Sequence, residues 1–295
     1  MKLYYQQFEG GVTNFGDCLN VWLWDQLIPD QLDDDERTAF VGIGTLLNDN
    51  LKRSTPNANR WVIFSSGVGY FDGPPLLRRT DHVYCVRGPL SAEAMGLDDS
   101  YAVTDGAALV RKVYKPSGIK KFKFAFMPHI EGIADEAWLS ICDDLGFDYI
   151  DPRLPVEECL RRISEAEVLL AEAMHGAIVA DALRVPWVPV VTTTNILSFK
   201  WSDWCGSIGL KFEPHWIAPM INRRKSGDVL QPLRTLRYQA RRGLSMRDLR
   251  AVSRSAKPLL SSEVMIANRT DELEHRLAKF RADHAAGAFR EMPVS

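Results

Sequence analysis

The residues around His175 combine groups that can handle an anion with the pattern of a strand–loop–helix–strand unit. An apolar run at residues 168–170 predicts a buried strand, which stops at a polar stretch, residues 172–176. A helical pattern follows and leads to a second apolar strand. His175 and Gly176 are therefore expected at the carboxyl end of a parallel strand, where a helix begins. That edge of an α/β sheet binds ligands, and a helix N-terminus favours an anion.

His175 suits two chemical tasks at such an edge. Its imidazole can contact a phosphate, and it can move a proton near neutral pH because the ordinary pKa of histidine is about 6.5. The alternative is structural, a histidine that only caps its own helix.

A second polar cluster, Asn14-x-Gly16-Asp17, follows the first predicted strand. Asn14 is a good N-cap for the next helix, and Gly16 allows a ligand to approach the backbone closely. A plain helix cap is the alternative to a binding role.

Arg87 ends another predicted strand. Because a guanidinium group keeps its charge, it must be solvated or paired. At a strand end it suits bidentate capture of a phosphate or carboxylate. The alternative is a structural salt bridge, for which Asp105 is a candidate partner.

The remaining candidates give weaker signals. Asp105 and His129 fall at strand ends, like Glu172 and His175, but no HExxH or similar spacing supports a metal site. The glycine-rich turns at residues 42–47 and 65–69 can face an anion with their N–H groups, yet they lack the GxGxxG spacing of a dinucleotide fold. The Trp201–Trp204 pair, around Lys200 and Asp203, suits stacking on a sugar face, with core packing as the alternative for either Trp.

The composition is that of a globular protein. Of the 295 residues, 46% are apolar and 25% are charged, and no apolar run approaches the roughly 18 residues that cross a bilayer. The first residues lack the pattern of a signal peptide, so we expect a cytoplasmic protein. The five cysteines show no CxxC or Cys/His ligand spacing, which argues against a zinc site or a disulfide framework.

The charge is distributed unevenly. Residues 223–257 contain eleven Lys or Arg and two acids, a net +9, so the rest of the chain carries −11 within a total of −2. A basic segment on an acidic body indicates contact with an anionic surface such as nucleic acid or a membrane leaflet. The alternative is the solvated face of a helix pair.

Two series of alternating strands and helices run along the chain. In the first, strands are predicted at residues 3–6, 38–44, 61–65 and 82–86, and helices at 15–27 and 89–95. In the second, strands are predicted at residues 122–127, 147–150, 168–170 and 188–191, the last of these closing the series, and helices at 134–145 and 155–166. This alternation predicts an α/β protein with parallel sheets. We expect two Rossmann-like domains, 1–115 and 116–225, facing one cleft, and a helical tail, 226–295, that ends in a helix over residues 269–289.

Four motifs together resemble the polysaccharide pyruvyl transferases, over about residues 2 to 215. They are Asn14-x-Gly16-Asp17, Arg87-Gly88-Pro89-Leu90-Ser91, Asp105-Gly106-Ala107-Ala108-Leu109 and His175-Gly176, in this order and at roughly these distances. The likeness is greatest to the bacterial exopolysaccharide branch that includes succinoglycan-type ketal pyruvyltransferases.

The resemblance implies a fold and a reaction. The fold would be GT-B-like, with two domains facing a cleft. Phosphoenolpyruvate would be the donor, as a co-substrate with no cofactor, and a hexose of a lipid-linked oligosaccharide would be the acceptor. The product would be a cyclic pyruvate ketal bridging two sugar hydroxyls. The basic segment would then contact the anionic inner leaflet, making the protein peripheral on the inner membrane, with no nucleic acid as partner.

The chemistry needs a general acid and a general base. His175 is the candidate acid, near the phosphate, and Asp17 or Asp105 is the candidate base. The expected donor ligands are Arg87, Gly176, Asn14, Gly16 and Lys200. The expected acceptor ligands are Glu172, His129 and Trp201.

One departure from the family pattern concerns the donor site. Many members have Arg two residues before this histidine, where the chain has Ala173. Arg87, Lys200 or Arg184 would have to supply the missing charge, or donor recognition would differ.

Two rival functions stay open at this stage. A nucleotide-sugar glycosyltransferase of the same fold would need a base pocket and a pair of cations, neither of which the sequence indicates. A non-catalytic glycan- or nucleic-acid-binding relative gains some support from the basic segment, although Tyr238 is its only aromatic residue, which argues against base stacking.

Overall fold

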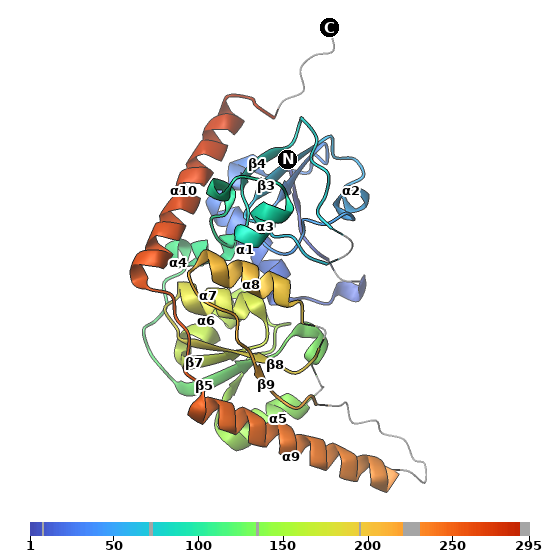
Figure 1. Cartoon of the computed structure of the whole chain (residues 1–295), viewed down its shortest axis with the longest axis vertical. Helices are drawn as coiled ribbons and strands as arrows, with labels where there is room; N and C mark the ends of the chain where they lie inside the picture. Colours follow the sequence, from blue (N-terminus) through green and yellow to red (C-terminus); the bar gives the residue numbers. More distant parts are fainter. Residues whose placement is uncertain (8, 71–72, 134–135, 195, 221–230, 290–295) are drawn as a thin grey trace.

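A computed structural model describes residues 1–7, 9–70, 73–133, 136–194, 196–220 and 231–289. Two parallel sheets lie one above the other along the long axis, with helices around and between them (Figure 1). The α/β class with parallel sheets and a helical C-terminal part is confirmed.

The first sheet has four strands in the order β1-β2-β3-β4, all parallel. They are β1 (Lys2–Tyr4), β2 (Thr38–Val41), β3 (Arg60–Phe64) and β4 (His82–Cys85). The accompanying helices are α1 (Phe15–Leu27), α2 (Leu51–Ser54), α3 (Pro89–Ala94) and α4 (Val110–Val113). β2 is buried along its whole length because strands and helices cover it on all sides.

The second sheet has five parallel strands in the order β6-β5-β7-β8-β9. They are β5 (Phe122–Met127), β6 (Asp148–Tyr149), β7 (Ala166–Ala171), β8 (Trp187–Val191) and β9 (His215–Trp216). The helices are α5 (Ala137–Leu145), α6 (Val156–Glu165), α7 (Met174–Ala182) and α8 (Ser198–Ser207).

One continuous apolar cluster joins the two sheets. It contains Phe40 and Phe64 from the first sheet and Leu169 and Trp187 from the second, all fully buried. Its middle is made by α1, α7 and the short 3-10 helix Gly106–Leu109, which pack on one another. The sheets are therefore held in place by shared core packing rather than by a linker alone.

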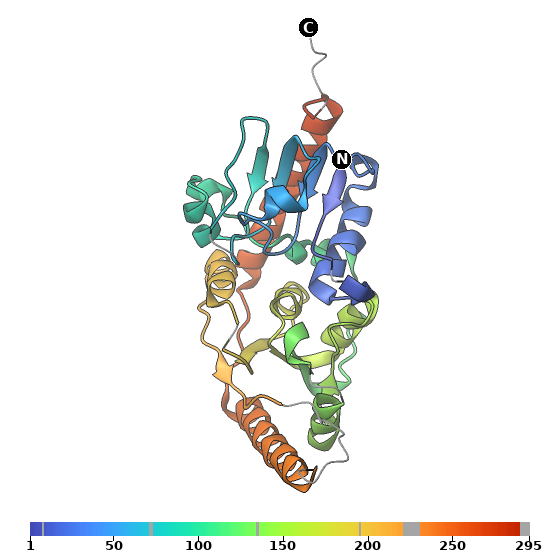
Figure 2. The ribbon, with the colours of Figure 1, turned by 90° about the vertical axis from the view of Figure 1, so that its right-hand side faces the viewer.

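Two long helices complete the chain, α9 (Gln231–Ser255) and α10 (Glu263–Ala285). α9 packs on α5 beside the second sheet, whereas α10 returns along the first sheet (Figures 1 and 2). Phe280 of α10 is fully buried against Phe40 and Tyr84.

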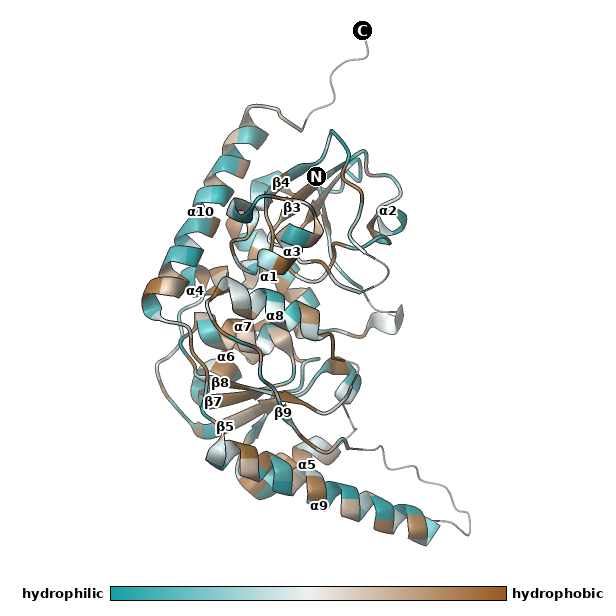
Figure 3. Cartoon of the chain, in the orientation of Figure 1, coloured by the Kyte–Doolittle hydropathy of each residue, from teal (hydrophilic) through white to brown (hydrophobic). Residues whose placement is uncertain are grey.

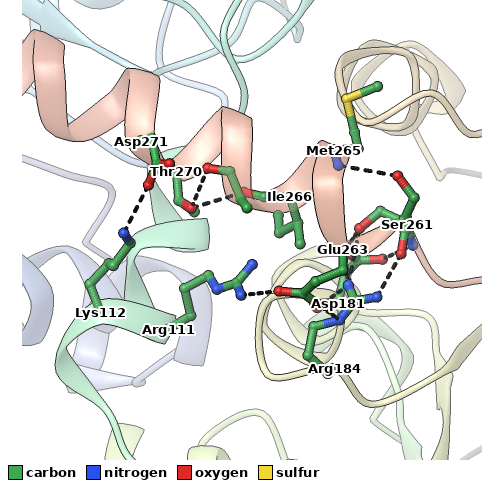
Figure 4. Close-up of polar contacts among 12 residues, drawn as sticks. Arg111, Lys112, Asp181, Arg184, Ser261, Glu263, Met265, Ile266, Thr270 and Asp271 are labelled. Atoms are coloured by element: carbon green, nitrogen blue, oxygen red, sulfur yellow. Dashed lines mark hydrogen bonds and ion pairs between the residues drawn. The ribbon is translucent and has the colours of Figure 1, made fainter.

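Ion pairs fasten the start of α10 to both halves of the chain (Figure 4). Glu263 pairs with Arg111 at 2.5 Å and with Arg184 at 2.8 Å. Ser261, just before the helix, is bound to the buried carboxylate of Asp181. α10 thus begins on the second half and ends packed on the first.

The predicted elements mostly agree with this structure. The helix over residues 15–27 and the strand over 122–127 are confirmed to the residue. The prediction that residues 188–191 form the last strand is wrong, because the two-residue strand β9 pairs with Val190 and Val191. The terminal helix begins at Glu263 rather than at residue 269 and ends at Ala285, because the side chain of Ser262 caps it by accepting from the Met265 N–H. None of the helices in the described residues combines the length and apolar character needed to cross a membrane.

Candidate functional site

A cavity of about 570 Å³ lies where strands of both sheets end. From the first half it is lined by Gln6 after β1, by the start of α1 and by the loop after β2. From the second half it is lined by His129 after β5, by the start of α7 and by Lys200 of α8. The carboxyl ends of parallel strands are where α/β proteins bind ligands, and this volume is in the range of small-molecule sites. Of the predicted site residues, Asn14, Gly16, Asp17, His129, His175 and Lys200 line the cavity together.

His175 is the second residue of α7, and 16% of its side chain is exposed. Its Nε2 atom is buried and lies 3.9 Å from the Asp105 Oδ2 atom. Its Nδ1 atom lies alongside Gly16, where a β-carbon would come within 2.2 Å. Burial lowers the pKa of His175 to about 3, and the nearby charges of Lys200 and Arg87 add to that effect. At neutral pH the imidazole is therefore uncharged.

Asp105 lies behind His175, away from the cavity lining. It is fully buried, and its Oδ1 accepts from the Ala107 N–H at 3.0 Å, which caps the 3-10 helix that follows. Burial raises the pKa of Asp105 to about 6. Its Oδ2 and the Nε2 of His175 have no hydrogen-bond partner among the described residues. Because these two atoms lie 3.9 Å apart, Asp105 is placed to orient the imidazole.

Asn14 and Asp17 form a pair at the start of α1. The Asn14 Nδ2 donates to the Asp17 Oδ2 at 2.6 Å, so the amide binds a carboxylate instead of capping the helix with its side chain. Burial raises the pKa of Asp17 to about 6, while Asn14 and the charge of Lys200 oppose the rise. A carboxyl group with this pKa can exchange a proton near neutral pH.

Lys200 is the cationic residue among the described residues that line the cavity. It is 7% exposed, and its Nζ donates to the Tyr70 hydroxyl at 2.8 Å. It lies three residues before Asp203 on α8, and this helix packs on α3 of the first half.

Arg87 is not in the cavity. Its guanidinium is fully buried and donates to Asp203 Oδ2, Thr45 Oγ1 and the Val68 carbonyl, each at 2.9 Å. The expected alternative of a structural salt bridge is the one found, but its partner is Asp203 and not Asp105. With its donors engaged and no exposed surface, Arg87 offers nothing to a donor molecule in this structure.

Asp203 was not among the predicted site residues. Its other oxygen accepts from the Ser91 N–H at 2.9 Å, and the Ser91 hydroxyl donates to Oδ2 at 2.5 Å. Two glycines leave room for the pair, since a β-carbon on Gly67 would lie 2.1 Å from Arg87 and one on Gly88 would lie 2.1 Å from the Asp203 carbonyl oxygen. These glycines are the sequence signal for the buried pair. From the sequence alone, Gly67 was interpreted as part of an anion-binding turn and Gly88 as part of the motif that begins at Arg87.

Two other predicted ligands, Glu172 and Trp201, lie outside the cavity lining. Glu172 is fully buried, and its carboxylate accepts from the backbone N–H groups of Thr192 at 2.5 Å and His129 at 3.0 Å, so it positions His129 rather than binding sugar. Burial raises the pKa of Glu172. Trp201 is fully buried and stacks on Phe212 at 4.8 Å, so the core-packing alternative holds.

Gly176 also lies outside the cavity lining. A β-carbon on Gly176 would meet the Met127 sulfur at 2.7 Å, so this glycine allows α7 to pack on β5. His129 does line the cavity, and burial together with Lys200 lowers its pKa to about 4.

Ala173 stands where many members of the family have arginine, so another residue would have to supply the positive charge. Ala173 lines the cavity at the N-cap of α7. Of the three residues expected to replace the family arginine, Arg87 is buried with Asp203 and Arg184 pairs with Glu263 beside α10. Lys200 alone of the three lines the cavity. No group of three or more His, Cys, Asp or Glu within the described ranges could hold a metal ion.

The family model for polysaccharide pyruvyl transferase matches residues 59–194. The chain is also 39% identical over 228 residues to the succinoglycan biosynthesis protein ExoV of Rhizobium meliloti (strain 1021), and the match covers 77% of this chain and 70% of that protein. The chain belongs to the polysaccharide pyruvyl transferase family. It is therefore a pyruvyltransferase, and the resemblance seen in the four motifs is confirmed.

The contact between Gly16 and His175 gives a first prediction for this pyruvyltransferase. Gly16→Ala should lower pyruvyl transfer at least ten-fold, because the new methyl group would displace the imidazole at the cavity wall. Gly243→Ala is the matched control, since a β-carbon at that helical position meets nothing within 4 Å. It should leave activity unchanged and stabilise α9 by about 1 kcal/mol. Equal activity of the two variants, measured as initial rates, would contradict this placement of His175.

The raised pKa of Asp17 gives a second prediction. Its folded-state pKa, about 6, exceeds its ordinary value of 3.8, so the folded state binds the proton more tightly than the unfolded state. Relative to Asp17→Asn, the free energy of unfolding should fall as the pH rises from about 4 to about 6, and stay constant above that. Urea unfolding of both proteins across this range measures the difference. A difference that is flat, or that rises with pH, would show that burial does not raise this pKa.

Proposed function

We propose that the enzyme transfers the pyruvyl group of phosphoenolpyruvate to a hexose of a lipid-linked exopolysaccharide repeat unit and forms a cyclic ketal. The observation that carries this proposal is the shared cavity, in which Lys200 and the α7 N-terminus face the same space as His175 and Asp17. Phosphoenolpyruvate has a phosphate and a carboxylate, and cations and free N–H groups suit both. The name of the 39% identical relative supports an exopolysaccharide acceptor.

The proposal includes an arrangement like that of GT-B glycosyltransferases. Residues 1–115 and 116–225 would be its two Rossmann-like domains and the helices after residue 226 its tail. The two parallel sheets and the cavity at their strand ends support it. In this arrangement donor and acceptor meet between the domains.

The reaction needs balanced proton transfers. A proton reaches the donor methylene carbon, a sugar hydroxyl attacks the adjacent carbon, and the bond to phosphate breaks. The second hydroxyl then closes the ketal. Of the two hydroxyl protons, one balances that on the new methyl group and the other leaves with phosphate, so no oxidant, metal or cofactor enters the scheme.

We assign the residues as follows. His175 is the general acid near the phosphate, because the negative charge of a bound donor would raise its pKa from the low value that burial gives it. Asp17 is the general base toward a sugar hydroxyl, since its pKa is near 6 and it lines the cavity. Asp105, out of reach of a ligand, is a positioning residue for His175. Asn14 and His129 would contact donor and acceptor respectively.

A third prediction concerns Lys200. Lys200→Gln should raise the KM for phosphoenolpyruvate about ten-fold or more, because the cavity loses the cation that stands in for the family arginine. Lys211→Gln removes an exposed lysine from the same region and should leave the KM unchanged. Transfer of label from radioactive phosphoenolpyruvate to lipid-linked saccharides extracted from membranes measures both. An unchanged KM in Lys200→Gln would remove Lys200 from the donor site.

We also propose that α9 contacts the anionic inner leaflet. Most of the described part of the basic segment is this helix, along which hydrophilic and hydrophobic residues are interspersed (Figure 3). Two of its leucines, Leu233 and Leu236, are 64% and 68% exposed. The other end of the helix is anchored by buried Leu249 and Val252. Basic residues near a membrane surface are attracted to anionic lipids. Residues 223–225, which add to the charge, lie outside the described residues.

The fourth prediction tests this contact. Replacing Arg234, Arg237, Arg241 and Arg242 by Gln should abolish most binding to vesicles that contain anionic lipid, since each basic residue near the surface contributes about 1 kcal/mol. Co-sedimentation with anionic and with neutral vesicles measures the loss. Replacing Lys279, an exposed lysine of α10, by Gln is the control. Unchanged partitioning of the fourfold variant would rule out a membrane role for α9.

A further inference from the structure

A second cavity, of about 580 Å³, lies beside β1 and is here called the β1 groove. It shares Tyr4, Gln6 and Ser54 with the main cavity, so the two cavities are neighbours. None of the steps proposed above uses it. Its remaining lining comes from β1, from the residues after that strand and from the segment after α2.

The chemistry of the β1 groove differs from that of the main cavity. Its lining includes two charged side chains, Lys2 and Glu36, which neutralise each other across 2.6 Å. The Asn57 amide also donates to Glu36, at 2.5 Å, which satisfies the second carboxylate oxygen. The groove therefore has no unpaired charge within its described lining, and an anionic ligand gains nothing there.

What the groove does offer is neutral hydrogen-bonding groups and aromatic surface. Gln6 and Gln7 are exposed amides, and Tyr4 and Tyr5 are half-buried phenols. Amides bind hydroxyl groups in pairs as donor and acceptor, and aromatic rings pack on the apolar faces of sugars. This combination fits a neutral carbohydrate.

We infer that the β1 groove is a binding site for the sugars that neighbour the modified hexose in the acceptor chain. The inference rests on the proposed function, and it names the part of the acceptor that this function leaves open. One sugar reacts in the main cavity, and the adjoining residues of the oligosaccharide lie along β1. The enzyme thereby selects a chain over a free hexose.

The test measures saccharide binding without any donor. Glucose, galactose and mannose are titrated calorimetrically beside linear neutral oligosaccharides of each, up to the tetrasaccharide. In at least one series the tetrasaccharide should bind at least ten-fold more tightly than its monosaccharide. Tyr5→Ala and Gln7→Ala should each weaken the tetrasaccharide about three- to ten-fold, the effect of one lost contact, and leave the monosaccharide unchanged. Gln26→Ala, which removes an exposed glutamine of α1 outside the groove, should change neither.

Two results would overturn the inference. One is the same affinity for monosaccharide and tetrasaccharide in every series. The other is a gain with length that both groove variants leave intact. The same proteins are also titrated with phosphoenolpyruvate, so that failure of the groove inference can be told apart from failure of the proposed function. The folded groove variants should bind phosphoenolpyruvate as the unaltered protein does. If the unaltered protein does not bind phosphoenolpyruvate, the proposed function is contradicted, whereas the saccharide result still stands.

Discussion

The buried ion pair between Arg87 and Asp203 is the constraint on which the site depends. Both side chains are fully buried, so neither charge can be left without its partner, and breaking such a pair costs about 3–5 kcal/mol. Arg87 follows β4 of the first sheet, whereas Asp203 belongs to α8, which follows β8 of the second. The pair therefore fixes α8 against the first half of the chain. Lys200, one turn earlier on the same helix, is thereby held at the cavity between the two sheets.

Burial at the cavity shifts the pKa values of two titratable groups, His175 and Asp17. His175 is kept neutral by burial and by the neighbouring cations, and the pKa of Asp17 is raised by burial. Each shift is reduced by a ligand of the appropriate kind, an anion beside His175 and a hydroxyl or a cation beside Asp17. Ligand binding would therefore change the proton affinity of both groups. Asp105, outside the cavity lining, places a buried carboxylate oxygen 3.9 Å from the second imidazole nitrogen, Nε2.

The sequence could predict the elements and the edge at which ligands bind, because both follow from hydrophobic periodicity and chain order. Residues 15–27 and the strand before His175 are examples. It could not predict which charged residues face the cavity. Arg87, Glu172 and Lys200 are all buried with distant partners, yet only Lys200 of the three lines the cavity. Those partners, Asp203 and the Thr192 N–H, are supplied by tertiary packing. Trp201 illustrates the same point, since its burial depends on Phe212 and Trp187 around it.

The donor assignment requires that the cavity bind phosphoenolpyruvate. The most direct measurement is thermal unfolding with and without it, beside a panel of nucleotide sugars and a His175→Ala variant. A ligand of the native state must raise the midpoint, by about 2.7 kcal/mol of stability at a hundredfold excess over its Kd. We expect phosphoenolpyruvate to raise it, nucleotide sugars to leave it unchanged, and the variant to lose the effect. A midpoint raised by a nucleotide sugar and not by phosphoenolpyruvate would contradict the donor assignment.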